Sequence, residues 1–419
     1  MEVNPTMAGS TIDHLIAMTV FLGAILIFVG LFNQTIQTAI LYQRNRYLAT
    51  KCSDLLDNIL LNPGIPENWG RSNVTPTSFG LQDPEFTQYR LSPFSLMRLV
   101  SSVGRPIYYP RTGRYYSNIT VGWGSFLFVS YAECVNYTTV SKLLGVNGSF
   151  GFQLTIEPIV NVYISKVSVG KPLKLMVKVV GSGFPLVNSP LSYLFFFVQK
   201  SNKQYPQYSV ESGVASTNNE GNVLLTFSNV DGEGDSYALI AYAHFCGLVG
   251  IGYFSHVTTS LDEYIVPMVD SFEERRVLLA HSWAVKEPRD KTSQSELKYN
   301  ASFVILSEDF TLREVPLENS TGKVGHVVYG QGSEKAYGII TIPTYNPGVL
   351  IVTYRKSAIE YGVVLMPWGI SSLAFPVVFG ENPIGKTWVA TDIRQVIVNG
   401  VAYQAKLALW SLEGYQVIG

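Results

Sequence analysis

Three carboxylates in one short turn are the residues of this chain whose spacing best suits chemistry. Asp231, Glu233 and Asp235 occupy alternate positions, as the first ligands of a calcium-binding loop do. The rest of an EF-type loop is missing, because Ser236 stands where that loop needs Gly and Tyr242 where it needs a bidentate Glu. The same segment suits a solvated hairpin turn. Calcium binding therefore stays an alternative, and the plain turn is the favoured interpretation.

Other residues capable of metal or acid–base chemistry are scattered along the sequence. The five histidines include no pair spaced four apart, and no Cys-x-x-Cys motif occurs, so the zinc patterns are missing. His244 and Cys246 fall on one face of a predicted strand but have no third ligand nearby in the sequence. The sequence contains no nucleophile elbow, no P-loop and no dinucleotide-binding glycine motif. We therefore expect no metal, no cofactor and no enzymatic activity.

Six Asn-x-Ser/Thr motifs form a separate group of candidate sites. One such motif is a weak signal, because Asn, Ser and Thr are common in turns. All six follow the apolar segment described next, which favours a glycosylated region outside the cytoplasm. The acceptor asparagines are Asn73, Asn118, Asn136, Asn147, Asn300 and Asn319.

The element that positions everything else is an apolar stretch near the N-terminus. No charged residue occurs from Leu15 to Phe32, a length that can cross the hydrocarbon core of a bilayer as a helix. Leu15, Phe21, Leu26 and Phe32 mark this predicted membrane span, whose first partner is the lipid bilayer. Gly23 and Gly30 lie seven apart on one face, where another membrane helix could approach closely, although Gly is also common in membrane helices.

The helical pattern continues beyond the predicted span. Apolar residues recur at helical spacing from Ile36 to Ile59, which predicts an amphipathic extension with one face to bury. We expect this face to contact the following domains. Asn62-Pro63-Gly64 ends the pattern.

The orientation of the predicted span follows from two opposing signals. Arg44, Arg46 and Lys51 follow the span and no Lys or Arg precedes it, so the positive-inside rule alone would place the C-terminal side in the cytoplasm. Large domains translocate largely regardless of such charges, and the glycosylation motifs favour the outside. The N-terminal residues lack the basic region and cleavage site of a secretory signal. We expect an uncleaved, single-pass anchor in the cell membrane with the C-terminal domains extracellular.

Composition narrows the class of protein. The net charge is −1 and only 15% of the 419 residues are charged, which argues against nucleic acid as a partner. The three cysteines cannot all pair within one chain. Cys52 is expected in the helix core, and Cys134 and Cys246 are expected as free buried thiols, with a disulfide between them as the alternative.

We predict an α+β protein in which a long N-terminal transmembrane and amphipathic helix precedes β-rich domains. The predicted units are an anchor helix at 1–62, a β-rich head at 63–159, an immunoglobulin-like β-sandwich at 160–256 and a C-terminal β-rich domain at 257–419. Residues 361–380 are also free of charge, but Pro367, Pro376 and two serines favour two buried strands over a second membrane span.

The N-terminal third resembles archaeal type IV pilin-like surface proteins. The apolar helix start near Asp13, the extension YQRNRYLATKCSDLLDNIL, the break LLNPGIPENWG and the segment VSKLLGVNGSFGFQLTI carry this resemblance over about residues 11–160. It implies a long anchoring helix that packs against a β-rich head outside the membrane. Gly9 lacks the preceding Lys or Arg that such proteins carry at their processing site, so the resemblance implies a membrane-anchored surface protein more than a filament subunit.

These patterns predict a structural, adhesive or pilus-associated surface protein, whose partners would be the bilayer and other membrane helices or pilus-like subunits. The alternative is an extracytoplasmic ligand-binding subunit of a transporter or sensor. That alternative requires an aromatic cleft between the β domains, around Trp283, Trp368 or Trp388. A third hypothesis, an extracellular hydrolase, would require a clustered pair of carboxylates with shifted pKa values.

Overall fold

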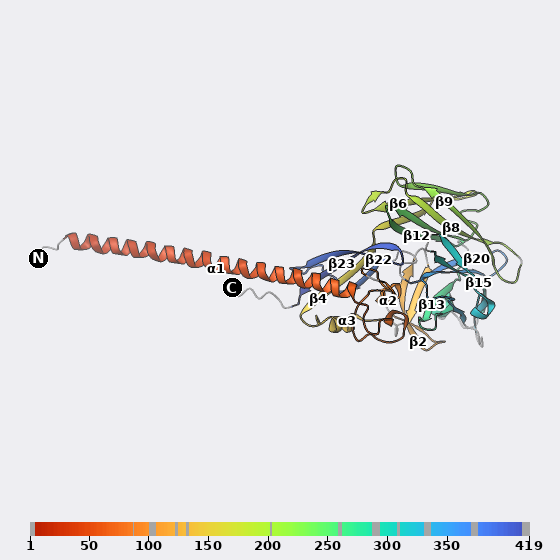
Figure 1. Cartoon of the computed structure of the whole chain (residues 1–419), viewed down its shortest axis with the longest axis horizontal. Helices are drawn as coiled ribbons and strands as arrows, with labels where there is room; N and C mark the ends of the chain where they lie inside the picture. The colour runs from red at the N-terminus through yellow and green to blue at the C-terminus, as the bar shows by residue number, and fades with distance from the viewer. Residues whose placement is uncertain are drawn as a thin grey trace.

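The computed structural model describes residues 5–86, 88–99, 106–121, 125–130, 134–201, 203–258, 262–286, 294–307, 311–330, 337–369 and 376–412. It consists of one long helix followed by a β-rich body (Figure 1). The helices are α1 (Pro5–Leu61), α2 (Pro93–Leu99), α3 (Tyr137–Leu143) and α4 (Ser282–Lys286), with 3-10 turns η1 (Trp69–Arg71) and η3 (Asn319–Thr321).

Five sheets form the body. The first has the order β1 (Ile107–Tyr109), β2 (Arg114–Val121), β3 (Ser125–Ser130), β13 (Ile265–Ser271), β14 (Arg276–His281) and β18 (Tyr337–Thr341). The second has the order β16 (Leu312–Val315), β15 (Ser295–Leu306), β19 (Gly348–Arg355) and β20 (Tyr361–Trp368), with β17 (Val324–Tyr329) also on β15. The third has the order β21 (Val377–Gly380), β4 (Phe150–Pro158), β23 (Val401–Ser411) and β22 (Ala390–Val398).

The remaining two sheets form a sandwich with its own core. One contains β10 (Asn222–Phe227), β6 (Leu173–Gly181), β5 (Val160–Lys166) and the short β7 (Phe184–Pro185). The other contains β12 (Leu248–His256), β11 (Tyr237–Phe245), β8 (Pro190–Gln199) and β9 (Gln207–Ser216). Alternate residues of β6, such as Leu175 and Val177, are buried against Phe195 and Leu239 of the facing sheet. The predicted β-sandwich at 160–256 thus has both sheets and a core within that segment.

The predicted division of the rest of the body differs from the structure. Strands β1–β3 share a sheet with β13, β14 and β18, and β3 pairs with β13 in parallel. Strand β4 lies between β21 and β23. The segments 63–159 and 257–419 therefore fold together as one unit, with the sandwich inserted between them in the sequence. Long-range strand pairing of this kind leaves no local signal.

Helix α1 changes its surroundings along its length. At 1.5 Å per residue its 57 residues extend about 85 Å. Leu48, Cys52, Leu56 and Ile59 are buried in the main core, where the helix packs on β22 and β23. We use "head" for residues 62–412 together with the helix segment Leu48–Leu61 that is packed against them.

The rest of α1 projects away from the head (Figure 1). Ile36, Ile40 and Tyr47, which were expected to face the following domains, are 42–61% exposed. Among the described side chains of α1, the first buried one is Leu48, so the apolar stripe starts about three turns before the buried part of the helix. The predicted helix end is confirmed, since α1 stops at Leu61 and Asn62 follows.

Residues 361–380 contain no second helix among those the structure describes. β20 (Tyr361–Trp368) is buried at every position, and β21 begins at Val377, as two strands rather than a span predict. Residues 370–375 lie outside the described part. In the described chain, Asp13–Leu61 is the one helix long and apolar enough to cross a membrane.

Candidate functional site: the apolar helix and its junction with the head

The projecting part of α1 has a surface suited to lipid. Leu15, Phe21, Leu26 and Phe32 are 58–73% exposed, although each is large and apolar. Exposing so many large apolar side chains to water is unfavourable, at about 25 cal/mol for each Å². In lipid the same side chains carry no such cost. The span predicted from the sequence is therefore one continuous helix with apolar side chains exposed around it.

Three threonine hydroxyls in and just after this span are hydrogen-bonded within the helix. The Thr19 hydroxyl donates to the Leu15 carbonyl at 2.5 Å, and the Thr35 and Thr38 hydroxyls donate to the carbonyls of Leu31 and Gln34 at 2.8 Å. Such back-bonding removes the need for water, which the hydrocarbon core lacks.

The charge-free stretch is longer than the hydrocarbon core alone. No Asp, Glu, Lys or Arg occurs at residues 14–43, which extend about 45 Å as a helix, the thickness of a bilayer with its headgroups. Tyr42 and Tyr47 are more than 60% exposed beside Arg44 and Arg46. Tyrosine and arginine are typical of the membrane–water interface. These residues predict that α1 crosses the membrane–water interface just before Leu48, the first residue of the helix that is buried in the head.

A polar junction fixes the helix to the sheet beyond that point. The Arg394 guanidinium on β22 donates to Asp57 Oδ1 at 3.0 Å, to Ser53 Oγ at 3.0 Å and to Asp392 Oδ1 at 2.7 Å. Burial alone would raise the pKa of Asp392, but the hydrogen bonds from Ser53, the Ile393 amide and Arg394 outweigh it and lower that pKa. The junction therefore ties two turns of α1 to one strand by charge-assisted hydrogen bonds.

Cys52 occupies the centre of the same contact. Its Sγ lies 3.4 Å from the Leu407 carbonyl and 3.6 Å from that of Ala390. Burial, with the nearby Asp392 charge, raises the pKa of its thiol to about 11. Cys52 is therefore a packed, unreactive thiol, as the sequence predicted.

The two glycines of the span leave open space on the helix. A Cβ added at Gly23 or at Gly30 would have no atom within 4 Å. Among the described residues nothing covers this face, so a second helix could approach there.

The acidic turn is not arranged as a calcium site. Lys166 pairs with Glu233, and Lys200 pairs with Asp235 at 2.9 Å. Asp231 Oδ1 accepts the amides of Glu233 and Gly234 at 2.9 and 3.0 Å, which lowers the pKa of Asp231. Within the described chain no three His, Cys, Asp or Glu side chains gather as a metal site. Lysines and backbone amides occupy the carboxylates here, which is the arrangement that the plain turn predicts.

The glycosylation motifs divide by exposure. Asn73, Asn136, Asn147 and Asn319 are exposed, although Asn136 also accepts the Thr139 amide at 2.8 Å as the N-cap of α3. Asn300 is only 8% exposed, and its Nδ2 donates to the Pro206 carbonyl at 3.0 Å. A glycan at Asn300 is incompatible with this packing, so that prediction is corrected. The side chain of Asn118 lies outside the described part.

The cysteines are unpaired, but not all are buried. Cys52, Cys134 and Cys246 are free, and Cys246 is exposed in the turn between β11 and β12 with a φ of 48°. The expectation of two buried thiols is therefore wrong for Cys246, because the hairpin turn faces solvent, and Cys134 is only half-buried.

The three tryptophans proposed for a cleft do not converge. Trp368 is fully buried, with its ring centroid 5.7 Å from Phe94 and 5.4 Å from Phe272. Trp283 packs with His281 and Tyr329, whereas Trp388 is 44% exposed in the loop before β22. They serve separate parts of the structure, so they do not line a common ligand site.

Sequence reasoning missed a buried polar cluster in the head. The Glu263 carboxylate is 1% exposed and binds Lys356 Nζ at 2.5 Å, His281 Nε2 at 3.2 Å and the Ser295 hydroxyl. Burial opposes ionisation of Glu263, but the contacts with Lys356 and Ser295 outweigh it and lower its pKa. No spacing links these residues, so only the fold reveals them.

The same cluster is poorly suited to acid–base catalysis. His281 Nδ1 accepts the Trp283 amide at 3.2 Å, so Nε2 carries the proton that faces Glu263. Both ring nitrogens are therefore occupied, and burial lowers the pKa of His281. A general base needs a free nitrogen within reach of its substrate.

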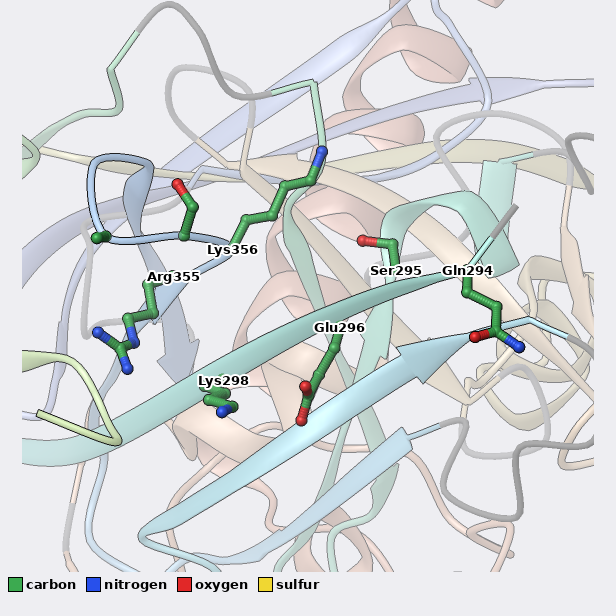
Figure 2. A pocket seen from close by; sticks show the side chains of 8 residues that line it. Gln294, Ser295, Glu296, Lys298, Arg355 and Lys356 are labelled. Atoms are coloured by element: carbon green, nitrogen blue, oxygen red, sulfur yellow. The ribbon is translucent and has the colours of Figure 1, made fainter. Parts of the chain in front are cut away.

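A polar pocket of about 450 Å³ opens beside this cluster (Figure 2). Glu296 and Lys298 line it from β15, while Arg355 and Lys356 line it from the end of β19. Arg355 donates to the carbonyls of Ser201 and Gln204 at 3.0 and 2.9 Å, and Lys356 is held by Glu263. Arg355 and Lys356 are therefore held by contacts within the head.

Comparisons with known proteins add little. No known protein family profile matches the chain, and no curated protein sequence matches it. Among 93 matching chains of solved structures is red sea bream transglutaminase, with 8% identity and a TM-score of 0.19. That match covers 61% of this chain and 37% of the transglutaminase chain. A likeness this weak supports no conclusion about fold or activity.

Proposed function

We propose that this is a single-pass membrane protein that displays its β-rich head outside the cell in a structural, adhesive or pilus-associated role. The observation that carries the proposal is the division of one uninterrupted helix. Residues 13–47 of α1 expose an apolar surface, and Leu48–Leu60 belong to the core of the head. A helix of this design holds the head at the bilayer without a flexible linker.

Three features support the outside location and the non-enzymatic role. Four glycosylation motifs have exposed acceptors in the head. The buried Glu263 cluster has its hydrogen-bonding groups occupied, and the tryptophans do not form the cleft that a ligand-binding subunit would need. A surface module, by contrast, requires only a stable head and a firm anchor.

The pilin-like resemblance supplies the finer part of the proposal. A helix with open space at Gly23 and Gly30 could pack against the corresponding helix of another subunit. Replacing Gly23 by Leu would block close approach, and replacing the lipid-facing Leu22 by Ala serves as the matched control. We expect disulfide-independent chemical crosslinking in membranes to decrease for Gly23→Leu alone. Equal crosslinking of both variants would argue for an isolated anchor.

Cys246 offers a direct test of display. It is exposed in the head, whereas Cys52 is buried in the core. A membrane-impermeant maleimide added to intact cells should label the wild-type chain, and the Cys246→Ser variant should lose most of that label. Labelling that appears only after the cells are broken would place the head in the cytoplasm and refute the proposal.

A further inference from the structure

One loop of the head lies beside the point where α1 leaves it. Residues 381–389 connect β21 to β22, and β22 begins at Ala390. The Ala390 carbonyl lies 3.6 Å from Cys52 Sγ, while Arg394, further along the strand, binds Asp57. Strand β22 therefore runs along α1 in the same direction, away from the apolar segment. The loop before Ala390 must lie at the end of the sheet that faces this segment, the side on which α1 enters the head (Figure 1).

The side chains of this loop are unusual for a water-exposed turn. Ile384 is 83% exposed, the highest value of any large hydrophobic residue in the described chain. Trp388 is 44% exposed, and Lys386 is exposed between them. Tryptophan prefers the membrane interface. The Lys386 ammonium lies 5.6 Å from the ring centroid of Trp410 on β23.

A second segment adds apolar surface at the same edge. Leu409 of β23 pairs with Ala390, so the residues after Leu409 continue toward the same end of the sheet. Leu412 is 44% exposed there, and its amide donates to the Ser149 carbonyl at 2.9 Å. Ile384, Trp388 and Leu412 thus lie at the same end of the third sheet, where its strands face the apolar segment of α1. We call this end of the sheet the apolar edge.

Measured along the axis of α1, the apolar edge lies at the level of the predicted membrane–water interface. Trp388 lies two residues before Ala390, or about 7 Å nearer the apolar segment if the strand direction continues. Along α1 that is about four to five residues before Cys52, beside Tyr47 and Leu48. Tyr42, Arg44 and Tyr47 are the residues of α1 whose types are typical of the membrane–water interface. An average helix tilt of about 20° can lower one side of the head further.

We propose that residues 381–389 form a second membrane contact, in which Ile384 and Trp388 enter the headgroup region of the bilayer that α1 spans. The occupant of this apolar edge is the lipid surface, because the edge continues the interfacial zone of the helix. Two contacts fix the rotation of the head about the helix axis, which one helix cannot do. The inference depends on the membrane insertion proposed above but not on the side of the membrane.

The test uses full-length protein in nanodiscs of phosphatidylcholine with phosphatidylglycerol. Cys246→Ser removes the exposed native thiol, and one nitroxide is attached at Ile384→Cys. Ile359→Cys is the matched control, because it is also an isoleucine, is 76% exposed and lies in the loop between β19 and β20. Leu26→Cys reports whether the helix itself is in lipid. The measurement compares collisions of each nitroxide with oxygen, which concentrates in lipid, and with a water-soluble nickel complex.

We expect the oxygen-to-nickel ratio at position 384 to exceed that at position 359 several-fold and to fall below that at position 26. Equal, aqueous ratios at positions 384 and 359, with position 26 in lipid, would overturn the inference and leave the anchor intact. An aqueous ratio at position 26 would instead overturn the proposed function and this inference with it. A nitroxide at Lys386→Cys repeats the test without removing Ile384, and it should show the same excess over position 359.

Discussion

The burial of Leu56 gives a quantitative test of how α1 is built into the head. Its side chain is fully buried where the helix packs on β22 and β23. Leu56→Ala removes three carbon atoms, which corresponds to about 2.4 kcal/mol of lost transfer free energy at about 0.8 kcal/mol for each buried methylene. The cavity left behind brings the expected loss to about 3–4 kcal/mol, within the measured range for such substitutions.

The assay is urea unfolding of the full-length chain in nanodiscs, followed by tryptophan fluorescence. Trp69, Trp368 and Trp410 are buried in the head and report its unfolding. With a slope of about 3 kcal/mol per molar urea, the midpoint should fall by about 1 M. Ile40→Ala on the same helix is the matched control. Its side chain is 46% exposed outside the head, so the midpoint should move by less than about 0.3 M.

The comparison of the two variants decides the outcome. Equal midpoints for Leu56→Ala and Ile40→Ala would mean that Leu48–Leu60 is not part of the core. The helix would then be attached only through the chain at Asn62, and the rigid connection described above would be wrong.

Three further predictions follow from individual sites. Burial lowers the pKa of His244, His256 and His281 below 6.5, so the unfolded chain binds protons first on acidification and the free energy of unfolding should fall as the pH drops from about 6.5 to 5. His281→Asn should flatten that dependence in urea titrations at several pH values, and an unchanged slope would contradict the burial argument. Mass spectrometry of glycopeptides from the native source should find glycans only among the exposed asparagines, and occupancy of Asn300 would contradict its packing against Pro206. Calorimetry with millimolar calcium should give no saturable heat, whereas a saturable heat lost in Asp231→Asn would restore the calcium site.

The features that sequence could predict depend on local patterns. The charge-free run predicted the apolar part of α1, and Asn62-Pro63-Gly64 predicted its end. Both signals come from residues that are neighbours in the sequence. The alternation from Leu173 to Val179 likewise predicts β6, whose alternate side chains are buried. The acidic segment is a turn, as favoured, but it joins β10 and β11 of different sheets and is not the hairpin that the sequence predicted.

The features that sequence missed depend on contacts between distant residues. Gly151 and Trp410 pair across β4 and β23, so no local pattern could show that residues 63–159 and 257–419 share sheets. Glu263 meets Lys356 and His281 only after two sheets are assembled. The stripe containing Ile36 and Ile40 shows a different limit. Apolar periodicity predicts that one face of a helix is shielded from water. It does not tell whether lipid or protein shields that face.

Two truncations test the central claim, that one helix serves the bilayer with its first part and the core of the head with its second. Deleting residues 1–47 removes the whole exposed segment and retains Leu48–Leu61. We expect the remaining chain to be released from membranes by alkaline carbonate and to unfold cooperatively in urea without lipid. Deleting residues 1–61 removes the buried helix as well, and we expect that chain to aggregate or lose its unfolding transition. Equal stability of both truncations, or retention of the 48–419 chain in the carbonate-washed membrane, would contradict the account.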